Sequence, residues 1–176
     1  MLAQEPFAVV GRQHDRHPIS RFDVPDLVDL PDDIRDTILA VQEKSGFVPN
    51  VFLAFARRPA EFRAFFAFHD ALMDSNVGLT KAEREMIVVA TSATNHCLYC
   101  VVAHGAILRI RAKNPLIADQ LATNPAKADL RERERAIVEF ALRIANDSAA
   151  ISDADVTAMR AGGFTDDEIW ETGWST

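Results

Sequence analysis

Apolar residues recur at helical spacing along almost the whole chain, and this periodicity constrains the fold more than any other feature of the sequence. Side chains three and four residues apart share one face of a helix, whereas a half-buried strand alternates polar and apolar residues. No alternating run of β-branched residues bounded by hairpin turns occurs in the sequence. The pattern therefore predicts an all-α protein folded as a compact helical bundle.

Residues typical of helix ends divide this pattern into segments. Three pairs have the spacing of a capping box, in which an N-cap side chain and an acidic side chain three residues later satisfy backbone N–H groups. These pairs are Thr80 with Glu83, Ser152 with Asp155, and Thr165 with Glu168. Other helices are expected to begin at Pro31, near Val51, at Pro59, near His96, after Pro115 and at Leu130. Gly46 and the pair Gly162-Gly163 fit helix stops.

The length of 176 residues is typical of one domain with room for a hydrophobic core. Residues 1–30 mix prolines, aspartates and valines, and we interpret them as an extended N-terminal arm that packs on the body or on another subunit. Residues 31–176 are predicted to form a single helical domain. The first half of the chain is rich in aromatic residues, so a homo-oligomer is expected rather than a monomer.

Charge and hydropathy argue against two classes of partner. The net charge of −7 and the pI near 5.2 provide no basic field for phosphate groups, so nucleic acid is not an expected partner. No segment approaches the roughly 18 consecutive apolar residues of a membrane span. The segment Met1–Arg12 lacks the basic and apolar regions of a signal peptide. A cytoplasmic location is expected, where thiols stay reduced and disulfides are transient.

The only two cysteines of the sequence, Cys97 and Cys100, lie one helical turn apart, and His104 follows one turn later. On a helix these three side chains share one face. Glu85 lies on the preceding predicted helix, and apolar neighbours on its face favour burial near the thiols. A Cys-x-x-Cys pair suits thiol chemistry, because one sulfur can attack as a thiolate and the other can close a disulfide.

Activation of a thiol requires a group that lowers its pKa from about 8.5. Asn95 fits an N-cap, which would put Cys97 in the first helical turn, where the positive end of the helix dipole favours an anion. His104 could take the proton of Cys100, and Glu85 could orient the imidazole. Dipole reasoning alone favours Cys97 as the attacking sulfur.

The spacing Glu85-x11-Cys97-x2-Cys100-x3-His104 resembles that of the alkylhydroperoxidase D-like branch of the carboxymuconolactone decarboxylase superfamily. The similarity runs from Pro25 to Trp170 and is closest to a subgroup of uncharacterized peroxidase-related enzymes. The segments that carry it, besides the motif, are Gly46–Asn50, Leu79–Glu85 and Ala112–Leu116. The resemblance implies an alkylhydroperoxidase D-like helical domain that reduces hydroperoxides without metal, haem or flavin. An external dithiol would restore the reduced enzyme.

The resemblance also implies roles for the motif residues. Cys100 would be the attacking thiolate and Cys97 its disulfide partner, while Glu85 and His104 would form a proton relay. We follow the family here, because His104 reaches Cys100 by the shorter helical step. Decarboxylase members lack the cysteine pair, so its presence argues against lactone chemistry. Relatives continue past the position of Trp170 with another apolar helix, so the last C-terminal helix of the family is expected to be absent.

Several residues near the motif have a second interpretation. Tyr99 and His96 are candidate substrate contacts, although a packed aromatic and an exposed helix-start residue explain them as well. Two cysteines on a helix can also be small core residues. The alternative function is a non-enzymatic redox-sensing or zinc-binding helical protein. Its zinc ligands would be Cys97, Cys100 and His104, together with His96 or Glu85.

Leu79–Val88 aligns with Leu130–Glu139, which is consistent with a degenerate internal duplication. Chance similarity between two capped helices explains the match equally well. Ala136 takes the position of Glu85 in the second copy, and no cysteine follows it. Only the first copy can therefore be catalytic.

Overall fold

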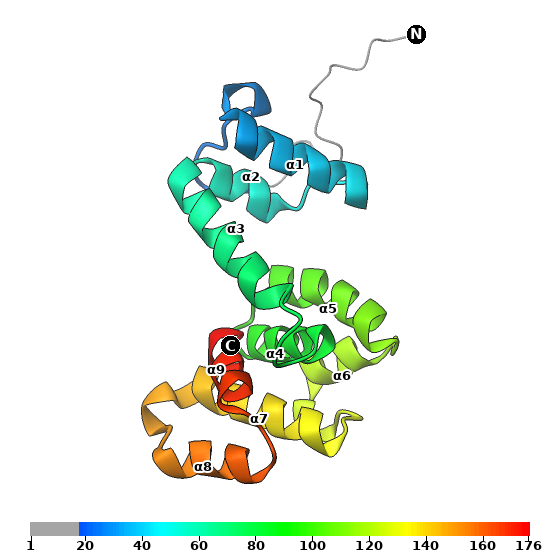
Figure 1. Cartoon of the computed structure of the whole chain (residues 1–176). Coiled ribbons are helices and arrows are strands. Elements are labelled where there is room, and N and C mark those ends of the chain that lie inside the picture. Colours follow the sequence, from blue (N-terminus) through cyan, green and yellow to red (C-terminus); the bar gives the residue numbers. More distant parts are fainter. Residues whose placement is uncertain (1–17) are drawn as a thin grey trace. The chain divides into compact units, whose positions relative to one another are not determined.

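The computed structural model describes residues 18–176 of the chain (Figure 1). Within this range the chain forms nine α-helices and three short 3-10 helices, and it contains no strand. The predicted all-α class is therefore confirmed. Residues 1–17, the first part of the predicted arm, lie outside the described residues. The chain forms two compact units, one ending at His69 and the other beginning at Asp70.

The first unit contains η1 (Leu27–Asp29), α1 (Asp32–Ser45), α2 (Asn50–Ala56) and most of α3 (Pro59–Met73). Its buried apolar side chains are Leu27, Leu30, Ile34, Ile38, Val48, Leu53, Ala56 and Phe62. Leu27 and Leu30 precede α1, so the chain before this helix already contributes to the core. Gly46 ends α1 with a φ of 79°, in the left-handed conformation that glycine adopts readily.

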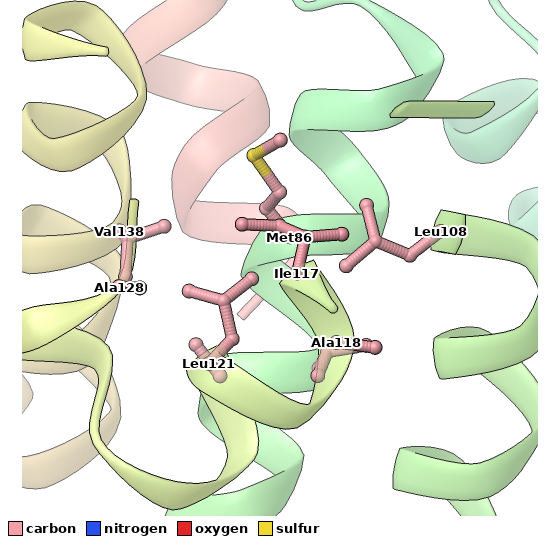
Figure 2. Close-up of a cluster of buried hydrophobic side chains, with 9 residues drawn as sticks. Met86, Leu108, Ile117, Ala118, Leu121, Ala128 and Val138 are labelled. Atoms are coloured by element: carbon pink, nitrogen blue, oxygen red, sulfur yellow. The ribbon is translucent and has the colours of Figure 1, made fainter. Parts of the chain in front are cut away.

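The second unit is organised around its first complete helix, α4. Its elements are α4 (Lys81–Thr94), α5 (Leu98–Ala112), α6 (Ile117–Thr123), η2 (Pro125–Lys127), α7 (Glu132–Asp147), η3 (Ser148–Ala150), α8 (Asp153–Ala161) and α9 (Asp166–Trp174). Met86, Val89 and Ala90 of α4 pack with apolar side chains of α5, α6 and α7. Figure 2 shows Met86, Leu108 and Leu121 within this cluster. On another face of α4, Ile87 packs in a second cluster with α7, α8 and α9. Because α4 is buried on both faces, the polar side chains that it carries are held in fixed positions.

Three consecutive charged residues of α4, Glu83, Arg84 and Glu85, are buried. Arg133 of α7 donates to Glu83 (2.8 Å), and Arg84 donates to both carboxylate oxygens of Glu171 on α9 (3.1 and 3.0 Å). Glu85 pairs with a histidine of α5. A buried charge is tolerated only when it is paired. These partners therefore fix the rotation of α4 about its own axis.

The turn before α4 is shaped by Glu171. Its carboxylate accepts the N–H of Leu79 (2.8 Å), while the Arg84 guanidinium donates to two carbonyls of the same turn (3.0 and 2.6 Å). Gly78 in this turn has a φ of 75°, and a Cβ there would lie 2.5 Å from the Glu171 carboxylate. A side chain here would be strained by the positive φ and would have to displace the Glu171 carboxylate. Helix α9 thus ties the turn to the start of α4.

The helix starts expected from capping boxes are confirmed. Glu83, Asp155 and Glu168 accept the N–H of their own N-cap residues at 2.7, 2.9 and 2.8 Å. Gly162 is the C-cap of α8, and Gly163 after it has a φ of 89°. In residues 18–176, no helix combines the length and the apolar character that crossing a membrane requires.

The two aligned segments form the starts of α4 and α7, and these helices contact each other. Glu134, the counterpart of Glu83, accepts the N–H of Arg131 at 2.9 Å. The likeness therefore includes the capping interaction. At the position equivalent to Glu85, Ala136 leaves α7 without a carboxylate.

Candidate active site

The cysteines lie at the sharp junction between α4 and α5. The N–H of His96 donates to the carbonyl of Ala93 (3.1 Å), and the N–H of Cys97 donates to the carbonyl of Ser92 (2.9 Å). These two bonds form a Schellman motif, which ends a helix with one residue in the left-handed conformation. His96 is that residue, with a φ of 56°. Asn95 is consequently the C-cap of α4, and its predicted role as the N-cap of the next helix is wrong.

This junction changes the position of each sulfur relative to α5. Cys97 is the N-cap and Leu98 the first helical residue, so Cys97 precedes the first turn that it was expected to occupy. Cys100 lies in that turn instead. Helical side chains lean toward the N-terminus, and the first N–H groups of a helix have no intrahelical partner. The N-cap and the first turn both lie at the positive end of the helix dipole, so the dipole argument does not separate Cys97 from Cys100.

The two thiols are half-buried, free and adjacent. Their sulfur atoms lie 2.8 Å apart, in a contact where Cys97 donates to Cys100. A disulfide requires about 2.05 Å between sulfurs. A small movement would therefore bring the pair to bonding distance.

Glu85 and His104 form the second pair of the site. Oε2 of Glu85 lies 2.8 Å from Nδ1 of His104, and the two side chains are 5% and 21% exposed. The expected burial of Glu85 is confirmed. An ionised carboxylate only accepts hydrogen bonds, so beside one the proton of a neutral His104 belongs on Nδ1, which leaves Nε2 to act as a base. This is the arrangement of a base held in one tautomer by a carboxylate.

The surroundings of Cys100 act on its pKa in opposite directions. Burial is the largest influence and raises the pKa, and the neighbouring Cys97 thiol raises it further. Hydrogen bonds from the Ser92 side chain and from the Cys100 backbone N–H lower it, but the net effect is a raised pKa. A thiol in this state needs a base to form a thiolate at neutral pH.

Ser92 is a site residue that sequence reasoning missed. It lies two helical turns after Glu85 on α4, is 9% exposed, and its carbonyl accepts the N–H of Cys97. Its spacing from Glu85 is the one signal that could have identified it, since residues seven apart share a helix face. A lone serine inside a helix is otherwise unremarkable.

The two candidate substrate contacts lie at the edge of the site. Tyr99, the second residue of α5, is 41% exposed. His96 is exposed, and its backbone makes the turn between the helices. Among residues 18–176, no three His, Cys, Asp or Glu side chains are grouped as metal ligands would be.

Comparison with known proteins gives the class of this fold and motif. The family model for the carboxymuconolactone decarboxylase family matches residues 59–121. A crystal structure from Ralstonia eutropha JMP134, described as an alkylhydroperoxidase AhpD core and uncharacterized peroxidase-related protein, is 62% identical with a TM-score of 0.87. The match covers 91% of this chain and 84% of that one.

A second crystal structure, an uncharacterized peroxidase-related protein from Silicibacter sp. TM1040, is 38% identical with a TM-score of 0.83. The match covers 94% of this chain and 88% of that chain. No curated protein matches significantly. The chain belongs to the alkylhydroperoxidase D-like branch of the carboxymuconolactone decarboxylase superfamily, as the motif predicted.

Proposed function

We propose that this protein is a dithiol peroxidase, which reduces hydroperoxides with Cys97 and Cys100 and moves protons through His104 and Glu85. The observation that carries the proposal is the pairing of two sulfurs 2.8 Å apart with a histidine whose Nδ1 is held 2.8 Å from a buried carboxylate. The similar structures described as peroxidase-related proteins support the same class of reaction.

The first step is the oxidation of Cys100. Nε2 of His104 accepts the thiol proton, and the Glu85 carboxylate stabilises the resulting imidazolium. The thiolate attacks the terminal oxygen of the hydroperoxide, so an S–O bond forms and the O–O bond breaks. The proton on His104 passes to the departing alkoxide. Cys100 is then a sulfenic acid, and the product is an alcohol.

The second step closes the disulfide. The Cys97 thiol attacks the sulfur of the Cys100 sulfenic acid, and water leaves with the Cys97 proton. Together the two thiols supply the two electrons and two protons that convert a hydroperoxide into an alcohol and water. An external dithiol then reduces the disulfide by thiol exchange and restores the starting state.

Two physical arguments support Cys100 as the attacking sulfur. It lies in the first turn of α5, and His104 follows it by one helical turn. The raised pKa of Cys100 is compatible with this role because His104 can act as the base that removes its proton. Once formed, a thiolate of higher pKa is the stronger nucleophile. Cys97, outside the helix and already in contact with the other sulfur, suits the resolving role.

The test is steady-state consumption of cumene hydroperoxide with three reductants: dithiothreitol, a lipoyl-type dithiol and a thioredoxin-type protein. We expect turnover by the wild-type chain and only background turnover by Cys100→Ser. In the absence of reductant, Cys97→Ser should react once per chain and then stop. No peroxide consumption with any reductant would refute the proposal. Metal analysis of the same samples would then show whether stoichiometric zinc, the alternative occupant of these thiols, is bound.

A further inference from the structure

Arg133 of α7 bridges two carboxylates that belong to other helices. Its Nε donates to Glu83 of α4 at 2.8 Å, and its guanidinium also donates to Glu168 of α9. The same guanidinium lies over the ring of Phe164, 4.5 Å from the ring centre. The side chains of Glu83 and Glu168 are only 2% and 13% exposed, so these contacts differ from surface ion pairs, which contribute little to stability. Removing Arg133 would leave two nearly buried carboxylates without this cation.

Both carboxylates also hold the start of their own helix. Oε2 of Glu83 accepts the N–H of Thr80 at 2.7 Å. Oε2 of Glu168 likewise accepts the N–H of Thr165 at 2.8 Å. In each case Oε1 is the oxygen that Arg133 contacts. The guanidinium is thus a common partner of two capping boxes, and it fixes the carboxylates that complete them.

The start of α4 matters to the candidate site because it carries Glu85. This residue lies two positions after Glu83, and its Oε2 is 2.8 Å from Nδ1 of His104 on α5. The first N–H groups of a helix lack intrahelical partners, so a helix start that loses its capping interactions frays more readily. A frayed start of α4 would no longer hold the Glu85 carboxylate against the imidazole.

We infer that Arg133 is a positioning residue for the Glu85–His104 pair, which it holds in place through Glu83 and the first turn of α4. For its consequence in catalysis the inference rests on the proposed peroxidase function. The hydrogen bonds of Arg133 are made with Glu83 and Glu168. An effect on the thiols therefore has to pass along α4 or act through the electric field of the charge.

A double variant separates these two routes. Arg133→Met removes the charge and the donors but keeps an unbranched stem beside Phe164. If Arg133 acts by positioning Glu85, its replacement should have no further effect once the Glu85 carboxylate is gone. A direct effect of the lost charge on the thiols would instead persist in the Glu85→Gln background.

The experiment measures the alkylation rate of Cys100 by iodoacetamide across pH in the full-length reduced chain, read by peptide mass spectrometry. The temperature is one at which circular dichroism shows every variant to be folded. At neutral pH Arg133→Met should react about threefold more slowly than wild type, with its profile displaced to higher pH. The double variant Arg133→Met/Glu85→Gln should match Glu85→Gln. Arg133→Lys keeps the charge without the planar fork, and its rate should lie between those of Arg133→Met and wild type.

Arg143→Met is the matched control. Arg143 lies on the same helix as Arg133 and donates to Asp155, whose other carboxylate oxygen accepts the N–H of Ser152 in the capping box of α8. The contact is therefore of the same kind, but it belongs to a helix that carries no residue of the candidate site. Arg143→Met should follow the wild-type profile.

Three results would overturn the inference. They are a wild-type profile for Arg133→Met, an equal displacement in Arg143→Met, and a double variant slower than Glu85→Gln by the factor that separates Arg133→Met from wild type. If Arg133→Met does not fold, Arg133→Lys and its double variant with Glu85→Gln decide the matter by the same comparison.

Alkylation does not depend on peroxide turnover, so the two proposals fail separately. The expected profiles in a protein that consumes no peroxide would refute only the peroxidase proposal. Peroxide turnover, with a displaced profile in Glu85→Gln but not in Arg133→Met, would refute only the role of Arg133.

Discussion

Replacing Glu171 by glutamine tests whether the buried ion pair between α4 and α9 holds the site-bearing helix. Arg84 is completely buried, the Glu171 side chain is only 14% exposed, and Nε of Arg84 has no hydrogen-bond partner among residues 18–176. Glutamine keeps the shape of the side chain and an oxygen for the N–H of Leu79. It removes the negative charge that offsets the guanidinium.

The expected cost follows from the burial of Arg84. Removing one partner of a buried ion pair costs about 3 to 5 kcal/mol, because the other charge is left uncompensated. Arg84 keeps its two hydrogen bonds to backbone carbonyls, so the lower end of this range applies. In a protein of this size about 3 kcal/mol corresponds to a melting temperature lower by roughly 6 to 12 °C.

Thermal unfolding followed by circular dichroism measures this change. Glu139→Gln is the matched control, since Glu139 is an exposed glutamate within α7 and its replacement should change stability by less than about 0.5 kcal/mol. Adding Arg84→Met to Glu171→Gln removes the unpaired, buried positive charge, so the double variant should recover part of the lost stability. If Glu171→Gln has the same melting temperature as the Glu139→Gln control, the ion pair does not hold α4 and the reasoning is refuted.

Three further predictions concern the site and its surroundings. Glu85→Gln should stay folded but slow both peroxide turnover and Cys100 alkylation near neutral pH by at least about tenfold, because His104 loses the charge that favours its protonation; an unchanged pH profile would remove Glu85 from the mechanism. His96→Gly should keep turnover and leave the melting temperature equal or higher, since glycine adopts the left-handed turn without cost; a loss of turnover in a stable variant would instead support a substrate contact. Arg143 holds the pKa of Asp155 down to about 2 from its ordinary 3.8, so this pair stabilises the fold above pH 3.8 and loses its effect as the pH falls toward about 2. When stability is measured as the pH falls from 3.8 toward about 2, Asp155→Asn should therefore lose less stability than wild type. Parallel curves of stability against pH for the two proteins would contradict this.

The helices could be predicted from sequence where their determinants are local. The capping pair Thr80 and Glu83 and the stop at Gly46 act within a few residues, and the structure has helix ends there. The α4–α5 junction could not be predicted in the same way. It depends on a histidine in a left-handed conformation, at a position where glycine is usual, so Asn95 was assigned to the wrong helix.

The candidate site was predictable only in part, because its polar residues are paired over long distances in the chain. Of the three charged residues from Glu83 to Glu85, only Glu85 was expected to be buried, yet all three side chains are buried. Their partners lie 50, 87 and 19 residues away. Only the third partner, His104, belongs to a recognisable motif. The hydrogen bond from the Cys97 N–H to the Ser92 carbonyl depends equally on how α5 leaves the end of α4.

The most direct test of the central claim is the product of one equivalent of hydroperoxide with the reduced chain, measured by intact mass and peptide mapping. We expect the wild type to lose about two daltons through a Cys97–Cys100 disulfide and to recover them with dithiothreitol. Cys97→Ser should instead gain one oxygen on Cys100, and Cys100→Ser should react far more slowly. Faster oxidation of Cys97 in Cys100→Ser than of Cys100 in Cys97→Ser would contradict the assignment of the two sulfurs. A wild-type chain that stays reduced and carries stoichiometric zinc would contradict the peroxidase itself.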